Sequence, residues 1–163
     1  MMTGTQSPMA ASFPLPSEGE SEIIDTRFGK IALKRDNPVV FPHGLLGMPD
    51  KINYFLTEFP SEKLKQFKML QSLDDHTLSF ITLPLDVENT IIAKDDVHTA
   101  CKDLGIEPKD TAILLIVSVH RSPTSVTLSV NARAPLMIDA KRRLAAQYVF
   151  PNDRYKVQHV ISA

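Results

Sequence analysis

Short hydrophobic stretches, separated by Gly, Pro, Asn and Asp, dominate this chain from Glu22 onwards. Stretches of this length and spacing predict β-strands joined by turns. We expect two strands around Gly29 within residues 22–35, and further strands at 38–42, 52–58, 78–84, 111–121, 125–132, 135–139, 145–150 and 155–161.

Three of these stretches have informative patterns. Alternation in 52–58 places Ile52, Tyr54 and Leu56 on one face of a strand. The stretch 111–121 is apolar on both faces, which is typical of a central strand. The stretch 125–132 alternates between an inward apolar set and an outward polar set, which are Val126, Leu128 and Val130 against Thr127, Ser129 and Asn131. We therefore predict a hairpin from about Ala112 to Asn131.

Residues 95–105 form the clearest helix pattern. Apolar residues recur there at i, i+3, i+4 and i+7, at Val97, Ala100, Cys101 and Leu104. This spacing predicts one buried helix face. Asp95 is the expected N-cap, and Gly105 the expected stop. One or two further helical turns are expected after Pro60, with Ser61 as N-cap.

Many short strands and few helical residues predict a mainly β fold, a small antiparallel barrel-like structure with one or two short helices. We expect residues 21–163 to form a single β-rich domain. Residues 1–20 are rich in Pro, Ser, Gly and Glu, and we expect them to be a disordered N-terminal tail.

The stretch 41–49, FPHGLLGMP, contains two leucines within a segment of loop-forming glycines and prolines. Neither strand nor helix periodicity explains this pair. We expect one leucine to plug the mouth of the barrel and the other to stay partly exposed as an apolar anchor for a protein partner. We assign Leu46 as the plug and Leu45 as the anchor.

Composition excludes several classes of function. The net charge is -1 and the pI is near 6.5, which argues against direct binding of nucleic acid. The single cysteine forms no intrachain disulfide and fits a reducing compartment. The longest apolar run, 112–117, is too short to span a membrane, and the N-terminus has no secretory signal pattern. We expect a soluble, monomeric, cytoplasmic protein.

The candidate chemistry is sparse. Asp74, Asp75 and His76 could serve acid–base or metal chemistry, but Asp-Asp between two strands is also ordinary turn chemistry, which we favour. Cys101 lies on the apolar helix face, so we expect core packing. The basic run 141–143 is interpreted as a solvated turn. No cofactor, metal or small-molecule motif is present, and the residues alone predict a non-enzymatic interaction module or structural protein.

Three stretches together resemble the FliW family of flagellar assembly factors. They are FPHGLLGMPDKINYFL at 41–56, KMLQSLDDHTLSFITL at 68–83 and SVTLSVNARAPLMIDAKRRLAAQYVF at 125–150. Their order and spacing match the family, and the resemblance covers about 22–161. It implies a small β-rich fold without enzymatic activity or cofactor.

The resemblance also implies two protein partners, flagellin and the carbon storage regulator, a small basic RNA-binding dimer that represses flagellin translation. Abundant flagellin would occupy the factor and leave the regulator free to repress. After flagellin export, the factor would bind the regulator and relieve repression. An alternative is a structural or interaction subunit with a different protein partner.

Individual positions carry the resemblance. The matches are Gly44, Leu45, Gly47 and Pro49 in the first stretch, Leu70, Gln71, Ser72, Asp74 and Asp75 in the second, and Asn131, Ala134 and Pro135 in the third. Met48, His76, Ala132 and Asp139 stand where the family often has other residues. The predicted protein-binding residues are Leu45, Leu46, Met48, Asp74, Asp75, Asp86, Glu88, Asn131, Arg133 and Pro135.

Acidic residues at predicted loops and at the helix start suggest how a basic partner is captured. They are Asp74, Asp75, Asp86, Glu88, Asp95 and Asp96. If these residues gather in space, they would steer a basic dimer and repel its RNA. The alternative is that they act as caps and turns.

Overall fold

The computed structural model describes residues 21–86 and 88–162, so the predicted N-terminal tail at 1–20 lies outside the described residues. The strands in chain order are β1 (Glu22–Thr26), β2 (Gly29–Leu33), β3 (Val39–Val40), β4 (Asn53–Glu58), β5 (Lys68–Ser72), β6 (Ser79–Leu85), β7 (Thr111–Arg121), β8 (Val126–Val130), β9 (Leu136–Asp139), β10 (Leu144–Gln147) and β11 (His159–Ser162). The helix is α1 (Lys94–Leu104), and 3-10 turns lie at Glu62–Leu64 and Pro108–Asp110.

The main sheet closes into a barrel. Its strand order is β7–β6–β5–β4–β3–β10–β9, and β9 pairs again with β7. Every neighbouring pair in this ring is antiparallel except β3 with β10, where Val40 pairs with Leu144. The mainly β, antiparallel, barrel-like fold predicted from the sequence is confirmed.

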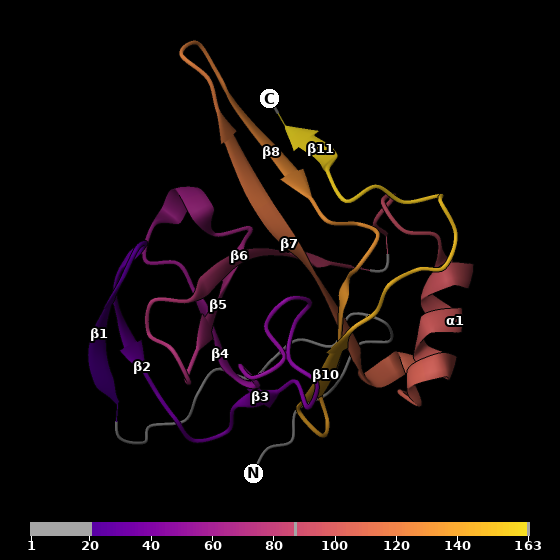
Figure 1. The fold of residues 1–163 in the computed structure, drawn as a ribbon, viewed down its shortest axis with the longest axis horizontal. Coiled ribbons are helices and arrows are strands. Elements are labelled where there is room, and N and C mark those ends of the chain that lie inside the picture. The colour runs from indigo at the N-terminus through magenta and orange to yellow at the C-terminus, as the bar shows by residue number, and fades with distance from the viewer. Residues whose placement is uncertain (1–20, 87, 163) are drawn as a thin grey trace.

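The long strand β7 belongs to both the barrel and an extension of it. Its first part, Thr111 to Ile116, pairs with β9 and β6, whereas Val117 to Arg121 pairs with β8. Strand β11 then pairs with the other edge of β8. In Figure 1 this three-stranded extension projects away from the barrel. The predicted hairpin of residues 112–131 is confirmed.

Alternate residues of the barrel strands enter two separate cores. Tyr54 and Leu56 of β4 face the lumen, together with Leu70, Leu114, Leu136 and Ile138 from neighbouring strands. Phe55 of β4 faces outwards into a second core, which the β1–β2 hairpin and α1 cover. The predicted face of Tyr54 and Leu56 is confirmed, but β4 is buried on both sides because its outer face is covered.

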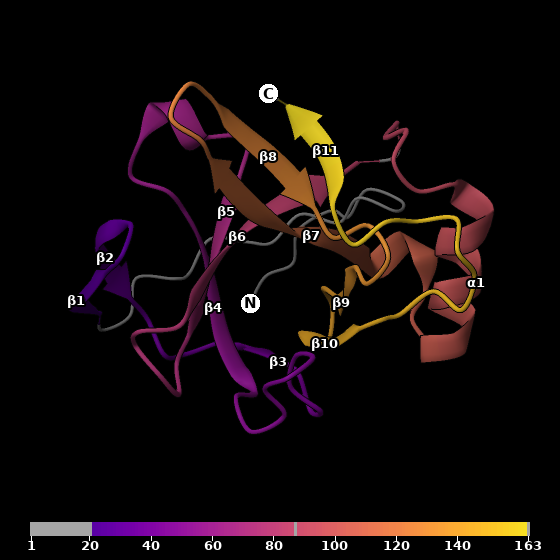
Figure 2. The same ribbon diagram turned by 45° about the horizontal axis from the view of Figure 1, so that its top comes forward.

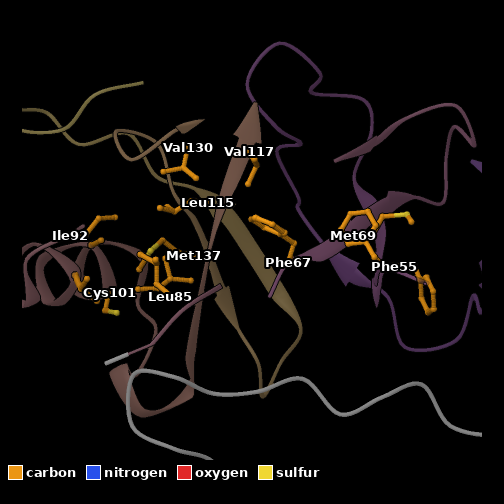
Figure 3. Packing of buried hydrophobic residues seen from close by; sticks show 14 of the residues in the cluster. Phe55, Phe67, Met69, Leu85, Ile92, Cys101, Leu115, Val117, Val130 and Met137 are labelled. Atoms are coloured by element: carbon orange, nitrogen blue, oxygen red, sulfur yellow. The ribbon is translucent and has the colours of Figure 1, made fainter. Parts of the chain in front are cut away.

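Helix α1 packs on the outer core. Val97, Ala100 and Cys101 are buried as predicted, and Figure 3 shows Cys101 near Leu85 and Met137. Gly105 ends the helix in the left-handed conformation, with φ 72°. The burial of this helix face explains why apolar residues recur at i, i+3, i+4 and i+7 along α1.

The predicted cap by Asp95 is wrong. The helix begins at Lys94, and its N-cap is Ala93, two residues before Asp95. Ala93 supplies no side-chain hydrogen bond. The backbone N–H of Ala93 instead donates to the hydroxyl of Tyr155 at 3.0 Å. Tyr155 also donates to the carboxylate of Asp96, and Arg154 Nη2 lies 2.7 Å from the same carboxylate. Asp96 is therefore buried beneath the C-terminal segment.

The structure differs from the predicted strands in two places. Strand β5 was not predicted, because its sequence, KMLQS, lacks β-branched and aromatic residues. In β8, Val126 is exposed because it lies towards the free end of the hairpin, whereas Ser129 is buried. Its hydroxyl is 2.9 Å from His120 Nε2, which satisfies the buried oxygen.

Hydrogen bonds test two further predictions, the N-cap at Ser61 and the solvated turn at residues 141–143. Ser61 accepts a hydrogen bond from Lys63 N at 3.2 Å, as its predicted capping role requires. The basic run 141–143 is only partly solvated. Arg143 has a φ of 59°, and its Nε donates to the carbonyl of Asn37 at 3.0 Å. Arg143 therefore fastens the β9–β10 turn to the segment before β3.

Candidate functional site: the mouth end of the barrel

Three connections meet at one end of the barrel, which we call the mouth end. They are the β3–β4 loop at 41–52, the β5–β6 turn at 73–78 and the β8–β9 connection at 131–135. Antiparallel pairing of β3 to β6 brings the first two connections to the same end. Strand β9 also begins there, because it is antiparallel to β10, which runs parallel to β3.

The β3–β4 loop folds back over the lumen. Gly44 N donates to Phe41 O, and Met48 N donates to Leu45 O, each at 2.8 Å. Gly44 has a φ of 68°, and a Cβ there would lie 2.3 Å from the carbonyl oxygen of Met48. Only glycine fits this close approach, which allows the loop to turn inwards.

The two leucines of this loop occupy opposite environments. Which leucine is buried and which is exposed is the reverse of the prediction. Leu45 is 3% exposed and packs in the lumen core, whereas Leu46 is 58% exposed. The prediction of one plug and one exposed leucine is confirmed. Its assignment is wrong: Leu45 is the plug, because the turn at Gly44 directs the next side chain inwards.

Gln147 at the end of β10 joins the first and third sequence stretches. Its Oε1 accepts from Leu46 N at 2.9 Å, and its Nε2 donates to Ala134 O at 3.1 Å. Ala134 N in turn donates to the side-chain Oδ1 of Asn131 at 3.0 Å. Exposed Leu46 is therefore held by a defined backbone contact. Sequence reasoning missed Gln147, since a glutamine at a strand end carries no pattern of its own.

Asp74 joins the first and second stretches. Its Oδ2 accepts from Ile52 N at 2.9 Å and from Asn53 N at 3.0 Å. The hydrogen bond from the Asn53 backbone is the largest cause that lowers the pKa of Asp74, so this carboxylate stays ionised at neutral pH. Asp74 thus fastens the end of the β3–β4 loop and adds negative charge to the mouth end.

Asp75 and His76 complete the β5–β6 turn. The Asp75 carboxylate accepts from Thr77 Oγ1 at 2.6 Å and from Thr77 N at 2.9 Å, and the side-chain bond lowers its pKa most. His76 Nε2 lies 2.9 Å from Arg35 Nη2. These contacts fit the turn interpretation rather than acid–base chemistry.

Tyr54 lies in the lumen beneath the loop. Its ring packs edge-on against Phe41, with centroids 5.3 Å apart. Burial, together with the nearby Asp74 and Asp50 carboxylates, raises the pKa of Tyr54 to about 12. Its buried hydroxyl has no hydrogen-bond partner among the described residues.

The remaining mouth-end candidates have mostly structural contacts. Met48 is partly buried and packs against the lumen core. The carbonyl of buried Pro135 accepts from Tyr148 N at 2.9 Å, which extends the pairing of β9 with β10. Arg133 is partly exposed, with Nη2 4.0 Å from Asp153 Oδ1. Val149, two residues beyond Gln147, adds a second exposed apolar side chain.

Asp86 and Glu88 lie at the opposite end of the barrel. Strand β6 separates them from Asp75, and its seven residues span about 23 Å. Asp86 Oδ1 accepts from Glu88 N at 3.0 Å, which is turn chemistry. Since Asp96 is buried against Arg154, the six acidic residues do not form one cluster. The condition that all six residues gather in space is therefore not met, because strand β6 holds the two groups apart.

Within the described residues, no group of three His, Cys, Asp or Glu side chains is placed to hold a metal ion. Cys101 is buried, its Sγ lies 3.4 Å from Thr111 Oγ1, and burial raises its pKa. A raised pKa disfavours the thiolate, so Cys101 has the character of a core residue.

The model of the FliW protein family matches residues 22–161. The chain belongs to the FliW family. Relatives named flagellar assembly factor FliW include those of Natranaerobius thermophilus, 31% identical over 140 residues, covering 85% of this chain and 90% of the relative, and of Geotalea uraniireducens, 29% identical over 140 residues, covering 85% and 82%. The family is one of flagellar assembly factors, not of enzymes.

A solved structure supports the fold of this FliW-family chain. The crystal structure of the flagellar assembly factor FliW superposes with a TM-score of 0.63 at 23% identity, covering 85% of this chain and 96% of that one. Among the helices of the described residues, none is long and apolar enough to cross a membrane.

Proposed function

We propose that this flagellar assembly factor acts by binding proteins at the mouth end, and that its partners are flagellin and the carbon storage regulator. The observation that carries this proposal is the convergence of three separate family stretches on one surface. Gln147 and Asp74 connect these stretches through hydrogen bonds to the β3–β4 loop. A surface assembled from distant segments and presenting exposed Leu46 suits protein recognition.

The mechanism we propose is partner switching. Flagellin, when abundant, occupies the factor and leaves the carbon storage regulator free to repress flagellin translation. When flagellin has been exported, the factor binds the regulator and antagonises that repression. This scheme requires that binding of one partner excludes the other.

The charge of the mouth end supports capture of a basic partner. The pKa values of Asp74 and Asp75 are both lowered, so both groups carry negative charge at neutral pH. Asp50 in the adjacent loop is also exposed, although its Oδ2 lies 3.4 Å from Lys51 Nζ. Such charges accelerate encounter with a positively charged protein more than they strengthen the final complex.

Three of the four positions that depart from the family pattern, Met48, His76 and Ala132, lie in the connections of the mouth end. Ala132 is fully buried, and Asp139 accepts from Lys141 N and Arg142 N at 3.0 and 3.1 Å as part of the β9–β10 turn. Met48 and His76 are both partly buried, Met48 against the lumen core and His76 in the β5–β6 turn. The residues at these four positions do not replace exposed Leu46 or the carboxylates of Asp74 and Asp75.

The experiment is a binding titration of the purified chain with purified flagellin and with purified carbon storage regulator, followed by competition between them. Both proteins should bind, and flagellin should displace the regulator. Binding of neither would contradict the proposal and favour a structural or interaction subunit with another partner. Simultaneous binding of both would contradict partner switching while retaining the two interactions.

A further inference from the structure

The outer edge of β11 is open to a further strand. Strand β11 ends the sheet, with β8 on one side and no strand on the other among the described residues. Figures 1 and 2 both show β11 at the border of the extension. An open edge presents N–H and C=O groups in register for another chain. A register shift between Val160 and Ser162 places the regular part of this edge at His159 and Val160.

Edge strands are usually protected by charged side chains or proline, and β11 has neither Asp, Glu, Lys, Arg nor Pro. The β1 strand provides a comparison within the same molecule. Its Ile23 is exposed, but ion pairs flank it: Lys30 Nζ lies 2.7 Å from Asp25, and Arg35 Nε lies 3.0 Å from Glu22. Val160 is equally prominent, at 60% exposure, without such neighbours on its own strand.

The charged residues of β7, β8 and the segment 154–162, which includes β11, have one sign. Neither residues 111–138, which include β7 and β8, nor residues 154–162 contain an Asp or Glu. The same segments carry Arg121, Arg133, Arg154 and exposed Lys156. Arg154 is paired with Asp96, and Arg133 Nη2 lies 4.0 Å from Asp153 Oδ1. An acidic ligand would therefore meet no repelling carboxylate in these strands.

We propose that the outer edge of β11 binds an extended acidic segment of a partner protein by strand addition, with Val160 packing against its apolar side chains and Lys156 facing its carboxylates. Strand addition obtains affinity from backbone hydrogen bonds and specificity from alternate side chains. A second copy of β11 is a poorer occupant, because it brings a second Lys156 and no carboxylate to the same edge. Val160 is on the extension, whereas the Lys156 carbonyl accepts from Ala132 N and Arg133 N of the β8–β9 connection. Val160 is therefore the position that separates this surface from the mouth end.

A pair of synthetic peptides tests this proposal. One alternates Glu and Val over about seven residues, and the other alternates Lys and Val at the same length. Fluorescence anisotropy of labelled peptides measures binding to the full chain, at low and at high salt. The acidic peptide should bind about tenfold or more tightly than the basic one, with the difference shrinking at high salt.

Three variants locate the binding edge. Val160→Asp and Lys156→Glu should each weaken the acidic peptide about tenfold, and the matched control Ile23→Asp, at an equally exposed strand residue, should leave it unchanged. Circular dichroism checks folding of each variant. If Val160→Asp unfolds, Lys156→Glu at an exposed loop position still tests the edge.

Equal affinity for the two peptides, or equal losses in Val160→Asp and Ile23→Asp, would overturn the proposal. Sedimentation of the wild-type chain distinguishes a second copy as the occupant. A wild-type dimer that Val160→Asp converts to a monomer would also overturn the proposal, whereas a monomer that binds the acidic peptide supports it.

Discussion

Leu45 and Leu46 are neighbours in the chain and occupy opposite environments. Leu45 is 3% exposed within the lumen, and Leu46 is 58% exposed at the mouth end. The Leu46 backbone is nevertheless held, because its N–H donates to Gln147 Oε1 at 2.9 Å. The loop thus closes the barrel with one leucine and presents the next one on a fixed backbone, so stability and the proposed binding should be separable within two residues.

Truncating each leucine should give opposite results. Leu45→Ala leaves a cavity in the lumen and should lower the free energy of unfolding by about 2–5 kcal/mol. Leu46→Ala should change it by less than about 0.5 kcal/mol and weaken partner binding instead. Urea denaturation and titration with each partner measure the two effects. If Leu46→Ala binds both partners as well as the wild-type chain does, Leu46 is not an anchor.

The glycines of the same loop provide a second matched pair. Both Gly44 and Gly47 have positive φ, 68° and 83°, so alanine is strained at either site by about 1 kcal/mol. At Gly44 the new Cβ would also lie 2.3 Å from Met48 O and 2.6 Å from Pro49 Cα, whereas at Gly47 nothing lies within 4 Å.

We therefore expect Gly44→Ala to lose on the order of 4 kcal/mol and Gly47→Ala about 1 kcal/mol. The shift of the urea midpoint of each variant measures this difference. Similar losses in the two variants would show that the close approach of the loop to Gly44 does not limit stability.

Sequence patterns predicted the strands whose apolar residues alternate, the β7–β8 hairpin and the buried face of α1. They predicted a barrel-like fold but not which strands close it, because the parallel pair β3–β10 joins residues far apart through a single pair, Val40 with Leu144. They also failed for Leu45 and Leu46, since a loop has no period from which to infer direction. The role of Gln147 was not predicted, because it depends on which segments meet at the mouth end.

The raised pKa values of the three tyrosines predict how the stability of the fold changes at alkaline pH. The chain has three tyrosines and no tryptophan, so its phenol absorbance is free of indole. Burial raises the pKa of Tyr54 to about 12, the hydrogen bond to Asp103 raises that of Tyr148 to about 12, and burial with the Asp96 bond raises that of Tyr155. Phenols of the unfolded chain ionise near pH 10.

Raised phenol pKa values stabilise the fold fully below about pH 10, and this stabilisation is lost as the pH rises towards about 12. Ultraviolet titration of the folded chain should therefore show little tyrosinate at about pH 10, where the denatured chain is about half ionised. Coincident titration curves for folded and denatured chains would contradict the burial of the Tyr54 phenol and the hydrogen bonds of Tyr148 and Tyr155 to carboxylates.

Charge at the mouth end should influence the rate of partner association. Asp74→Asn with Asp75→Asn removes two charges there, and Asp86→Asn with Glu88→Gln removes two at the opposite end. Stopped-flow mixing with the carbon storage regulator should show roughly tenfold slower association for the first pair only, an effect that salt suppresses. Because Asp74 also fastens the loop, a urea midpoint is measured for each double variant. Equal association rates for the two double variants would contradict electrostatic steering by the charges of the mouth end.

The central claim is that partners bind at the mouth end, and amide hydrogen exchange tests it most directly. Exchange is measured on the full chain alone, with purified flagellin and with purified carbon storage regulator. The account predicts that each partner slows exchange in residues 44–53, 73–78 and 131–135, and leaves residues 86–92 and 140–143 at the opposite end unchanged. Protection confined to residues 86–92 and 140–143, with the mouth end unchanged, would contradict it.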